Sequence, residues 1–164
     1  MLKLLNQNLV ENQEGRSSST KGRKSTAKPK RGFASTSQHK ESSKITAKSL
    51  DWETDEVTLS LTGSESTKSF DAVIACDCIY NDALIEPLVQ TCIDVCKLRK
   101  SENDGEGVEP TVCIVAQQLR SAEVFEGWLK AFYAVFRVWR VPDEELIDGL
   151  KSDSGFVIHI GILR

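Results

Sequence analysis

The sequence contains little histidine and no long apolar run, and both shortages narrow what the protein can be. Histidine occurs only at His39 and His159, among 164 residues. His39 lies in a polar segment and His159 in an alternating apolar run, so we expect a structural or exposed role for each. No Ser–His or Cys–His arrangement for nucleophilic catalysis is indicated. No stretch reaches the roughly 20 apolar residues of a membrane-spanning helix, and the start, MLKLLNQNLVEN, is too interrupted for a signal peptide.

Glycine and cysteine are missing from the patterns that would bind a nucleotide or a metal. Gly105 and Gly107 lie in a polar loop after an expected helix, the wrong context for a dinucleotide fingerprint. This makes an unrelated Rossmann-like oxidoreductase a distant alternative. The five cysteines show no disulfide-framework spacing, and the pair Cys76 and Cys78 has no second pair or ordered histidine for zinc. We therefore expect no metal site, and reduced, buried thiols as in a cytoplasmic or nuclear protein.

The net charge of −3 hides a strong asymmetry. Residues 16–48 carry ten Lys and Arg against one acid, whereas the remainder carries eleven basic and twenty-three acidic residues. Apolar spacing predicts one amphipathic helix over residues 1–14. The Ser/Lys-rich composition predicts a disordered basic insertion over residues 15–44. Its blocks KGRK and KPKR would suit a weak RNA contact or a nuclear import signal, with a solvated surface loop as the plainer interpretation.

From residue 45 onward the pattern is that of an α/β domain. The sequence predicts strands over residues 45–53, 71–77, 111–118, 136–142 and 155–163, helices over 84–100 and 121–136, and a short strand or extended loop over 56–61. The alternation of strands and helices favours a doubly wound, mostly parallel sheet. No helix of ordinary length separates the last two strands, so we expect that pair to be antiparallel.

Polar and aromatic residues follow three of these strands, where ligands bind in open α/β sheets. They are Trp52 after Asp51, the Asp77-x-x-Tyr80 motif, and Gln117-Gln118 with Arg120. An indole can stack on a ring such as adenine. A carboxylate can accept from an ammonium, and a tyrosine hydroxyl adds a directional acceptor. Taken singly, Asp77 could cap the next helix, Tyr80 could belong to the core, and Trp52 could anchor a loop.

The segments LDWE, FDAVIACDCIY, VCIVAQQLR and F-x-x-W-L-x-x-F together resemble a known family. They are similar to the class I S-adenosylmethionine-dependent protein-lysine methyltransferases of the methyltransferase-like 21 group, and most similar to the fungal ribosomal lysine N-methyltransferase 5 proteins. DCIY after a buried strand is the most specific of these motifs. The resemblance covers residues 45–164, and residues 1–14 resemble the helix after the family's second strand. It implies the C-terminal part of a seven-stranded Rossmann-like methyltransferase sheet.

The resemblance also implies a cofactor and a role for each site residue. S-adenosylmethionine would be the methyl donor, with Trp52 lining its adenine end and the Cys76 backbone bordering it. Asp77 would orient the lysine amine or stabilise its charge, and Tyr80 would narrow the channel, as the two catalytic residues. Arg120 would contact the substrate, a ribosomal or translation protein. The sulfonium donor is already activated, so alignment and desolvation can supply most of the rate.

One part of that family pattern is missing from the sequence. No E-x-G-x-G loop precedes a helix, and no acidic strand end is placed to hold ribose hydroxyls. In the family both belong to the first two strands, which we expect to lie before Met1. The strand over residues 71–77 would then present an open apolar edge. We therefore expect an incomplete copy that is poorly stable alone and binds S-adenosylmethionine weakly or not at all.

Two functions of different classes follow from these observations. The first is a protein-lysine methyltransferase that acts on a ribosomal or translation protein. The alternative is a non-catalytic interaction module that uses the sheet and residues 16–48 to bind RNA or a protein partner. Methyl transfer that is lost on replacing Asp77 would favour the first function. A salt-sensitive association with RNA that does not depend on Asp77 would favour the second.

Overall fold

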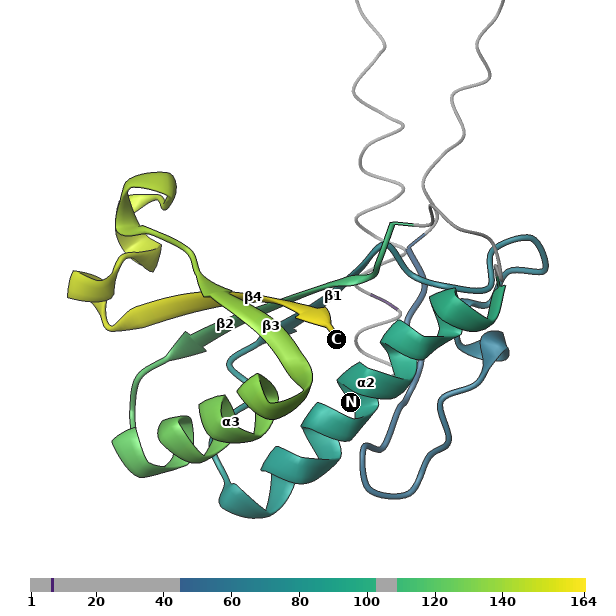
Figure 1. Cartoon of the computed structure of the whole chain (residues 1–164), viewed down its shortest axis with the longest axis horizontal. Helices are drawn as coiled ribbons and strands as arrows, with labels where there is room; N and C mark the ends of the chain where they lie inside the picture. The colour runs from purple at the N-terminus through teal and green to yellow at the C-terminus, as the bar shows by residue number, and fades with distance from the viewer. Residues whose placement is uncertain (1–6, 8–44, 103–108) are drawn as a thin grey trace, which may run out of the picture. The chain divides into compact units, whose positions relative to one another are not determined.

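The computed structural model describes Gln7, residues 45–102 and residues 109–164 (Figure 1). The chain divides into two compact units, Met1–Leu50 and Asp51–Arg164. In the first unit, Gln7 is helical and exposed, and residues 45–50 form no regular element. The predicted helix over residues 1–14 and the predicted disordered insertion over residues 15–44 otherwise lie outside the described residues. The second unit holds every strand described below.

The strand predicted over residues 45–53 is wrong, and local hydrogen bonds explain why. The backbone turns at residues 52–54. The Glu53 N–H donates to the Asp51 carboxylate at 2.9 Å, and the Asp51 N–H donates to the Asp55 carboxylate at 2.8 Å. Aspartate side chains that bond nearby backbone groups compete with strand pairing. Of the short strand or extended loop predicted over residues 56–61, residues 56–58 form no regular element, and the rest belongs to a 3-10 turn, Leu59–Thr62.

Four strands and two helices make up the ordered α/β core. The strands are β1 (Ala72–Cys76), β2 (Val112–Gln118), β3 (Phe136–Arg140) and β4 (Phe156–Leu163), and the helices are α2 (Ile85–Glu102) and α3 (Ala122–Val135). The strand order is β1-β2-β4-β3. β1 and β2 are parallel, whereas β4 is antiparallel to both β2 and β3. The antiparallel pairing of the last two strands is confirmed, but the described sheet is mixed rather than mostly parallel.

The helix ends follow ordinary capping chemistry. The Asn81 side chain accepts from the Ala83 N–H at 3.0 Å and opens a 3-10 turn, Asp82–Leu84, that leads into α2. Pro87 is the third residue of α2, inside the first turn, where its missing N–H costs little. Ser121 caps α3 by accepting from the Val124 N–H at 3.5 Å. None of the described helices is both long enough and apolar enough to cross a membrane.

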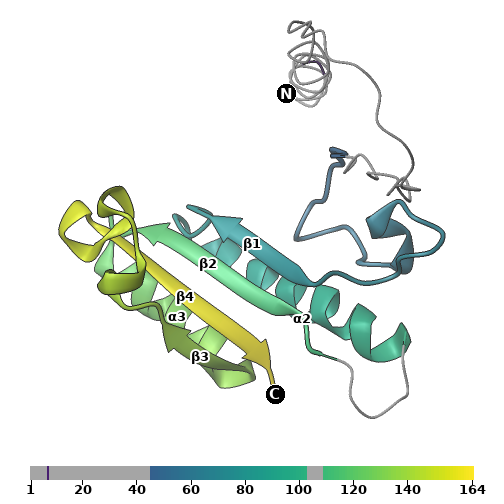
Figure 2. The same cartoon turned by 90° about the horizontal axis from the view of Figure 1, so that it is seen from above.

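Both helices cover the same face of the sheet, as Figure 2 shows. One hydrophobic cluster joins Ala75 of β1 and Val115 of β2 to the apolar side of α2 and α3. Its largest members form an aromatic stack: the Trp128 and Phe132 rings lie 5.1 Å apart, and the Phe132 and Phe136 rings 4.2 Å apart. Phe132 and Phe136 are completely buried. This stack packs α3 against β4. It thereby fixes where α3 lies relative to the end of β2, the strand that precedes it in the chain.

The Phe132 ring lies so close to β4 that position 161 must be glycine. A Cβ atom added to Gly161 of β4 would lie 2.5 Å from Cζ of Phe132. We therefore expect Gly161→Ala to lower the free energy of unfolding by about 1–3 kcal/mol, because the ring has no free volume to move into. Urea denaturation followed by far-UV circular dichroism would measure the change. Gly149→Ala is the matched control, since nothing lies within 4 Å of its added Cβ; an equal loss in both variants would contradict the packing argument.

The opposite face of the sheet carries an apolar row across all four strands. Register places Ile74 beside Ile114, Ile114 beside Ile160, and Ile160 beside Trp139. Ile74 is 66% exposed and Trp139 is 51% exposed. Among the residues that the structure describes, β1 is an outer strand with no partner on its far side. The open apolar edge predicted from the sequence is therefore present in the described sheet.

The five cysteines are free thiols in different environments. Cys92, Cys96 and Cys113 are buried, Cys78 is half-buried and Cys76 is exposed. The Cys96 and Cys113 sulfurs lie 3.5 Å apart in the core. Hydrogen bonding of the protonated Cys113 thiol with Cys92 and Cys96, together with burial, raises the pKa of Cys113. The Cys113 thiol is therefore a neutral packing group, whereas the expectation of burial is wrong for Cys76, which is exposed.

His159 of β4 is buried against α3 and should make stability depend on pH. Its pKa is lowered from the ordinary value of 6.5, first by burial and then by the nearby charge of Arg140. Below pH 6.5 the unfolded chain therefore binds more protons than the folded chain. Stability that is fully present above that value should be lost as the pH falls. Urea midpoints across this pH range would show a steeper loss for wild type and His39→Asn than for His159→Phe; identical slopes would contradict the assignment.

Candidate active site

Asp77 follows β1 directly and has an unusual backbone conformation. Its N–H donates to the Ala116 carbonyl at 2.8 Å, which extends the β1–β2 ladder by one bond. Its φ is +54°, and it is the only non-glycine residue with positive φ in the described parts of the chain. Aspartate tolerates this left-handed region better than most residues, but the conformation still costs about 1–3 kcal/mol. Such strain, held in place by the surrounding structure, is typical of functional sites.

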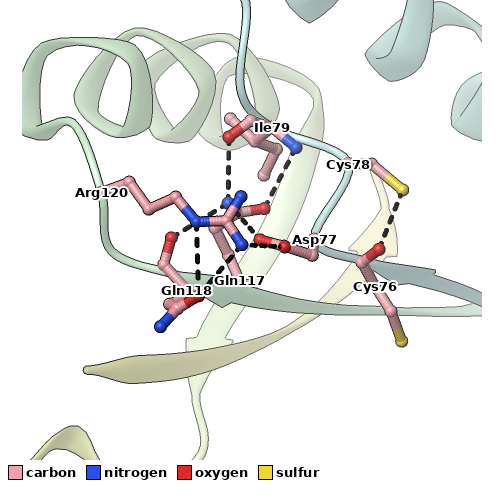
Figure 3. A network of polar contacts seen from close by, with 7 residues as sticks. All are labelled: Cys76, Asp77, Cys78, Ile79, Gln117, Gln118 and Arg120. Carbon is pink, nitrogen blue, oxygen red and sulfur yellow. Dashed lines mark hydrogen bonds and ion pairs between the residues drawn. The ribbon is translucent and has the colours of Figure 1, made fainter. Parts of the chain in front are cut away.

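Gln117 holds Asp77 and the residues after it. The Gln117 amide nitrogen donates to the Asp77 carboxylate at 3.1 Å and to the Ile79 carbonyl at 2.9 Å. Its amide oxygen accepts from the Ile79 N–H at 3.1 Å. Gln117 is only 2% exposed, although it lies at the end of β2. One buried side chain therefore fixes both the carboxylate and the backbone of the loop 77–79 (Figure 3).

Arg120 binds the other oxygen of the same carboxylate. The guanidinium lies 2.5 Å from Asp77 Oδ2, and it also donates to the Gln118 side chain at 3.0 and 3.3 Å. In Figure 3 the Arg120 side chain reaches across from the loop after β2 to the Asp77 carboxylate. Both side chains of the ion pair are partly exposed, 57% for Arg120 and 37% for Asp77. The pair therefore orients the carboxylate without removing it from solvent.

The arrangement presents an oriented carboxylate that can take one more donor. Among the described residues, each carboxylate oxygen of Asp77 has a single side-chain partner, Gln117 on one and Arg120 on the other. Each oxygen has two lone pairs, so an ammonium or amine can still bind. Asp77 is well placed to align such a group at the carboxyl edge of β1 and poorly placed to attack an electrophile, because both oxygens are already engaged. The chemistry indicated is orientation and charge stabilisation.

The other residues of the β1 end are positioned less firmly. Tyr80 is 64% exposed, and in the described structure no hydrogen bond joins it to Asp77. The Cys78 thiol donates to the Cys76 carbonyl at 3.4 Å, and the Cys76 side chain points away from the Asp77 contacts in Figure 3. Burial raises the pKa of Cys78, so its thiol stays protonated at neutral pH and is a weak nucleophile.

Trp52 lies apart from this group. It is half-buried in the turn at residues 52–54 and packs against the hydrophobic cluster. No hydrogen bond or ion pair of the described residues connects it to Asp77. Of the five predicted site residues, the structure thus joins Asp77 and Arg120 directly, with Cys76 adjacent in the chain. Tyr80 lies three residues on, and the role predicted for Trp52 stays a prediction.

Gln117 is the site residue that sequence reasoning undervalued. The sequence places it among the polar residues at the end of a strand without indicating a role for it. The signal was available in the alternation of β2, where Cys113, Val115 and Gln117 share the buried register. A polar side chain in a buried register must find partners. Its partners lie about forty positions away in the chain, on the loop after β1.

One family of known proteins matches the part of the chain that holds this site. The model of a protein family described as lysine methyltransferase matches residues 34–120, a little over half of the chain. The matched range includes β1, α2, β2 and the contacts of Gln117 and Arg120 with Asp77. No curated protein matches the sequence. In the described residues no group of three His, Cys, Asp or Glu side chains could hold a metal ion.

Proposed function

Since the chain belongs to the lysine methyltransferase family, we propose that its Asp77 site receives the lysine amine of a protein substrate for methylation. The observation that carries the proposal is the engaged but accessible Asp77 carboxylate at the carboxyl edge of β1. Two side chains from the end of β2 fix it, and one side of it remains in solvent. A substrate lysine needs such an oriented acceptor. A lysine methyltransferase acts on a protein substrate, so membership of this family also implies a protein partner.

The chain's own residues would act by positioning. S-adenosylmethionine supplies an already activated methyl group when it is bound. Asp77 would accept a hydrogen bond from the incoming amine and stabilise the charge that the nitrogen acquires. Gln117 and Arg120 would keep the carboxylate from rotating away, so that little reorganisation is needed. Tyr80 would border the approach of the lysine side chain from its exposed position.

The described residues would contact only part of S-adenosylmethionine. The strained backbone at Asp77 and the adjacent Cys76 would border the methyl-bearing end, and the positive φ of Asp77 supports this placement. Acidic side chains follow one other strand end, at Asp143–Glu145 after β3, but β3 lies at the opposite side of the described sheet from β1, and no glycine-rich turn opens α2 or α3. Because the fit is partial, we propose that Trp52 and Cys76 contribute to cofactor binding without forming a complete site by themselves.

The substrate and location belong to the proposal. We propose a ribosomal or translation protein as substrate, on the similarity of DCIY and its neighbouring segments to the methyltransferase-like 21 group and its fungal ribosomal members. This would place the protein in the cytoplasm or the nucleus. Arg120 would contact the substrate through whatever part of its guanidinium Asp77 leaves free, since 57% of the side chain is exposed.

A second function is favoured by the charge of residues 16–48. Ten basic residues against one acid would attract an RNA backbone. In this alternative the protein is a non-catalytic interaction module that binds RNA or a protein partner. Binding to ribosomal RNA should then weaken steeply with salt and remain unchanged in Asp77→Asn. The methyltransferase proposal instead requires that variant to change activity.

Transfer of a tritiated methyl group to lysine tests the proposal. We would assay ribosomal proteins with the chain alone and with a joined chain, defined as this chain fused behind the glycine-rich strand–loop–helix segment of another lysine methyltransferase. Labelled methyl-lysine is expected with the joined chain and little or none with the chain alone. A joined chain that folds and binds S-adenosylhomocysteine but labels no lysine in any fraction would overturn the proposal.

A further inference from the structure

The face of the sheet that α2 and α3 leave uncovered is apolar from one outer strand to the other. Figure 2 looks onto this face, with both helices behind the sheet. Register aligns Ile74, Ile114, Ile160 and Trp139 in one row across it. The two ends of the row, Ile74 and Trp139, are both more than half exposed. A contiguous apolar surface of this kind marks an interaction site.

The dimensions of this face suit an interface between proteins. The four strands hold five to eight residues each. With strands about 4.8 Å apart and a rise of about 3.3 Å per residue, the face projects roughly 400 Å². Its side chains protrude, so two such faces together would bury about 1,000 Å², the lower bound for a specific protein interface. A small ligand would leave most of this area in water.

The charge of the face and of its surroundings argues against a nucleic acid or a membrane as the partner. Within the four described strands, alternation places one charged side chain on this face, that of Arg137. One cation cannot track a phosphate backbone. The loop after β3 carries five acids against one lysine over residues 143–153, and it would repel an anionic lipid surface. The face therefore fits an apolar protein surface.

We propose that two copies of the chain pack these faces together as a sheet-on-sheet dimer. Stacked sheets lie about 10 Å apart with their strands nearly aligned. A twofold axis parallel to the strands reverses the strand order, so β3 of each copy lies over β1 of the other. Trp139 then packs on Ile74 of the other copy, because register places both residues at the same level along the strands.

The opposite ends of the face are complementary in size, which favours a second copy over an unrelated protein. β1 presents the small Ala72 beside Ile74, whereas β3 presents the large indole of Trp139. The twofold axis places the large end over the small end twice, so one match fills both halves of the interface. Arg137 lies at the level of Ala72 on an outer strand. Its guanidinium can therefore reach past the alanine into water.

Sedimentation of the full chain over a range of concentrations tests the proposal. We expect a monomer–dimer equilibrium with a micromolar dissociation constant, as the modest area implies, and a melting temperature that rises with protein concentration. Ile74→Lys should weaken association at least about tenfold, because it places a charge at the centre of an apolar contact. Tyr133→Lys is the matched control. It adds the same charge at a 59% exposed position of α3, on the other side of the sheet, and should leave association unchanged.

A second variant and a distance measurement make the test specific. Trp139→Thr keeps a residue that suits an outer strand but removes the indole, and it should weaken association at least about tenfold with the circular dichroism of wild type. Within one chain three strand spacings, about 14 Å, separate Ile74 from Trp139. In a mixture of labelled and unlabelled copies, a nuclear Overhauser effect between these two side chains would therefore arise only between copies, and it is expected.

Three results would overturn the proposal. The first is a monomer at every concentration, which would leave the face open or covered by another partner. The second is a dimer that Ile74→Lys and Trp139→Thr weaken no more than Tyr133→Lys does, which would place the contact elsewhere. The third is a dimer that depends on Ile74 and Trp139 but shows no effect between them across copies.

Discussion

Replacing Asp77 with asparagine should lower methyl transfer by the joined chain about 100-fold, because the charge that stabilises the methylated amine is lost. Asparagine is the informative substitute. It keeps the shape of the side chain and tolerates the positive φ of 54°, whereas alanine would add backbone strain to the loss of the carboxylate. The maximal rate with tritiated S-adenosylmethionine would be compared with the rate for the wild-type joined chain.

Asp82→Asn is the matched control for this comparison. Asp82 lies five positions further on, in the 3-10 turn before α2, and its exposed side chain is not among the contacts of the Asp77 site. It carries the same charge and should leave the rate within about twofold of wild type. If both proteins are folded and Asp77→Asn transfers methyl groups about as fast as Asp82→Asn, then Asp77 has no role in methyl transfer.

Replacing Gln117 with leucine should have the second large effect, on both stability and activity. Leucine fills a similar volume but leaves the Ile79 N–H and carbonyl without their buried partner. Each such orphaned group costs about 1–3 kcal/mol, so the free energy of unfolding should fall by roughly 2–5 kcal/mol. Asp77 would also lose one of its two fixed contacts. Urea denaturation measures the first effect, and the rate of methyl transfer measures the second.

The Ile79 amide reports directly on its contact with Gln117. Hydrogen exchange at the Ile79 amide should accelerate in Gln117→Leu, because its acceptor is the Gln117 side chain at 3.1 Å. Gln118→Leu is the neighbouring control. It removes an equivalent amide whose side-chain partner is Arg120, and it should leave exchange at Ile79 unchanged. Equal acceleration in the two variants would show that Gln117 holds the loop no more than its neighbour does.

Local patterns were sufficient for most of the ordered elements. The apolar run of β1, the alternation of β2 and β4, and the helical spacing of α2 and α3 are properties of consecutive residues. The Ser121 cap and Pro87 within the first turn of α2 are equally local. The strand expected over residues 45–53 failed because Asp51 and Asp55 bond to nearby backbone groups. Such competition depends on rotamers that a hydrophobic pattern does not encode.

The site was predictable in its position and unpredictable in its contacts. The sequence predicts that Asp77, Tyr80 and Arg120 follow strand ends at one edge of the sheet, and the structure brings Asp77 and Arg120 together there. That Arg120 binds Asp77 depends on the register of β1 and β2, where Cys76 is paired with Ala116. The antiparallel placement of β4 between β2 and β3 was likewise a matter of long-range pairing. It buries His159 against α3, which spacing along the chain does not reveal.

The central claim is that the β1 end is where cofactor and lysine meet, and a titration of the joined chain with S-adenosylhomocysteine in amide NMR tests it most directly. The account predicts saturable binding with its largest shifts at Cys76, Asp77 and Cys78, and far weaker shifts when the chain is titrated alone. Saturable binding by the joined chain that leaves these three amides unmoved would contradict it.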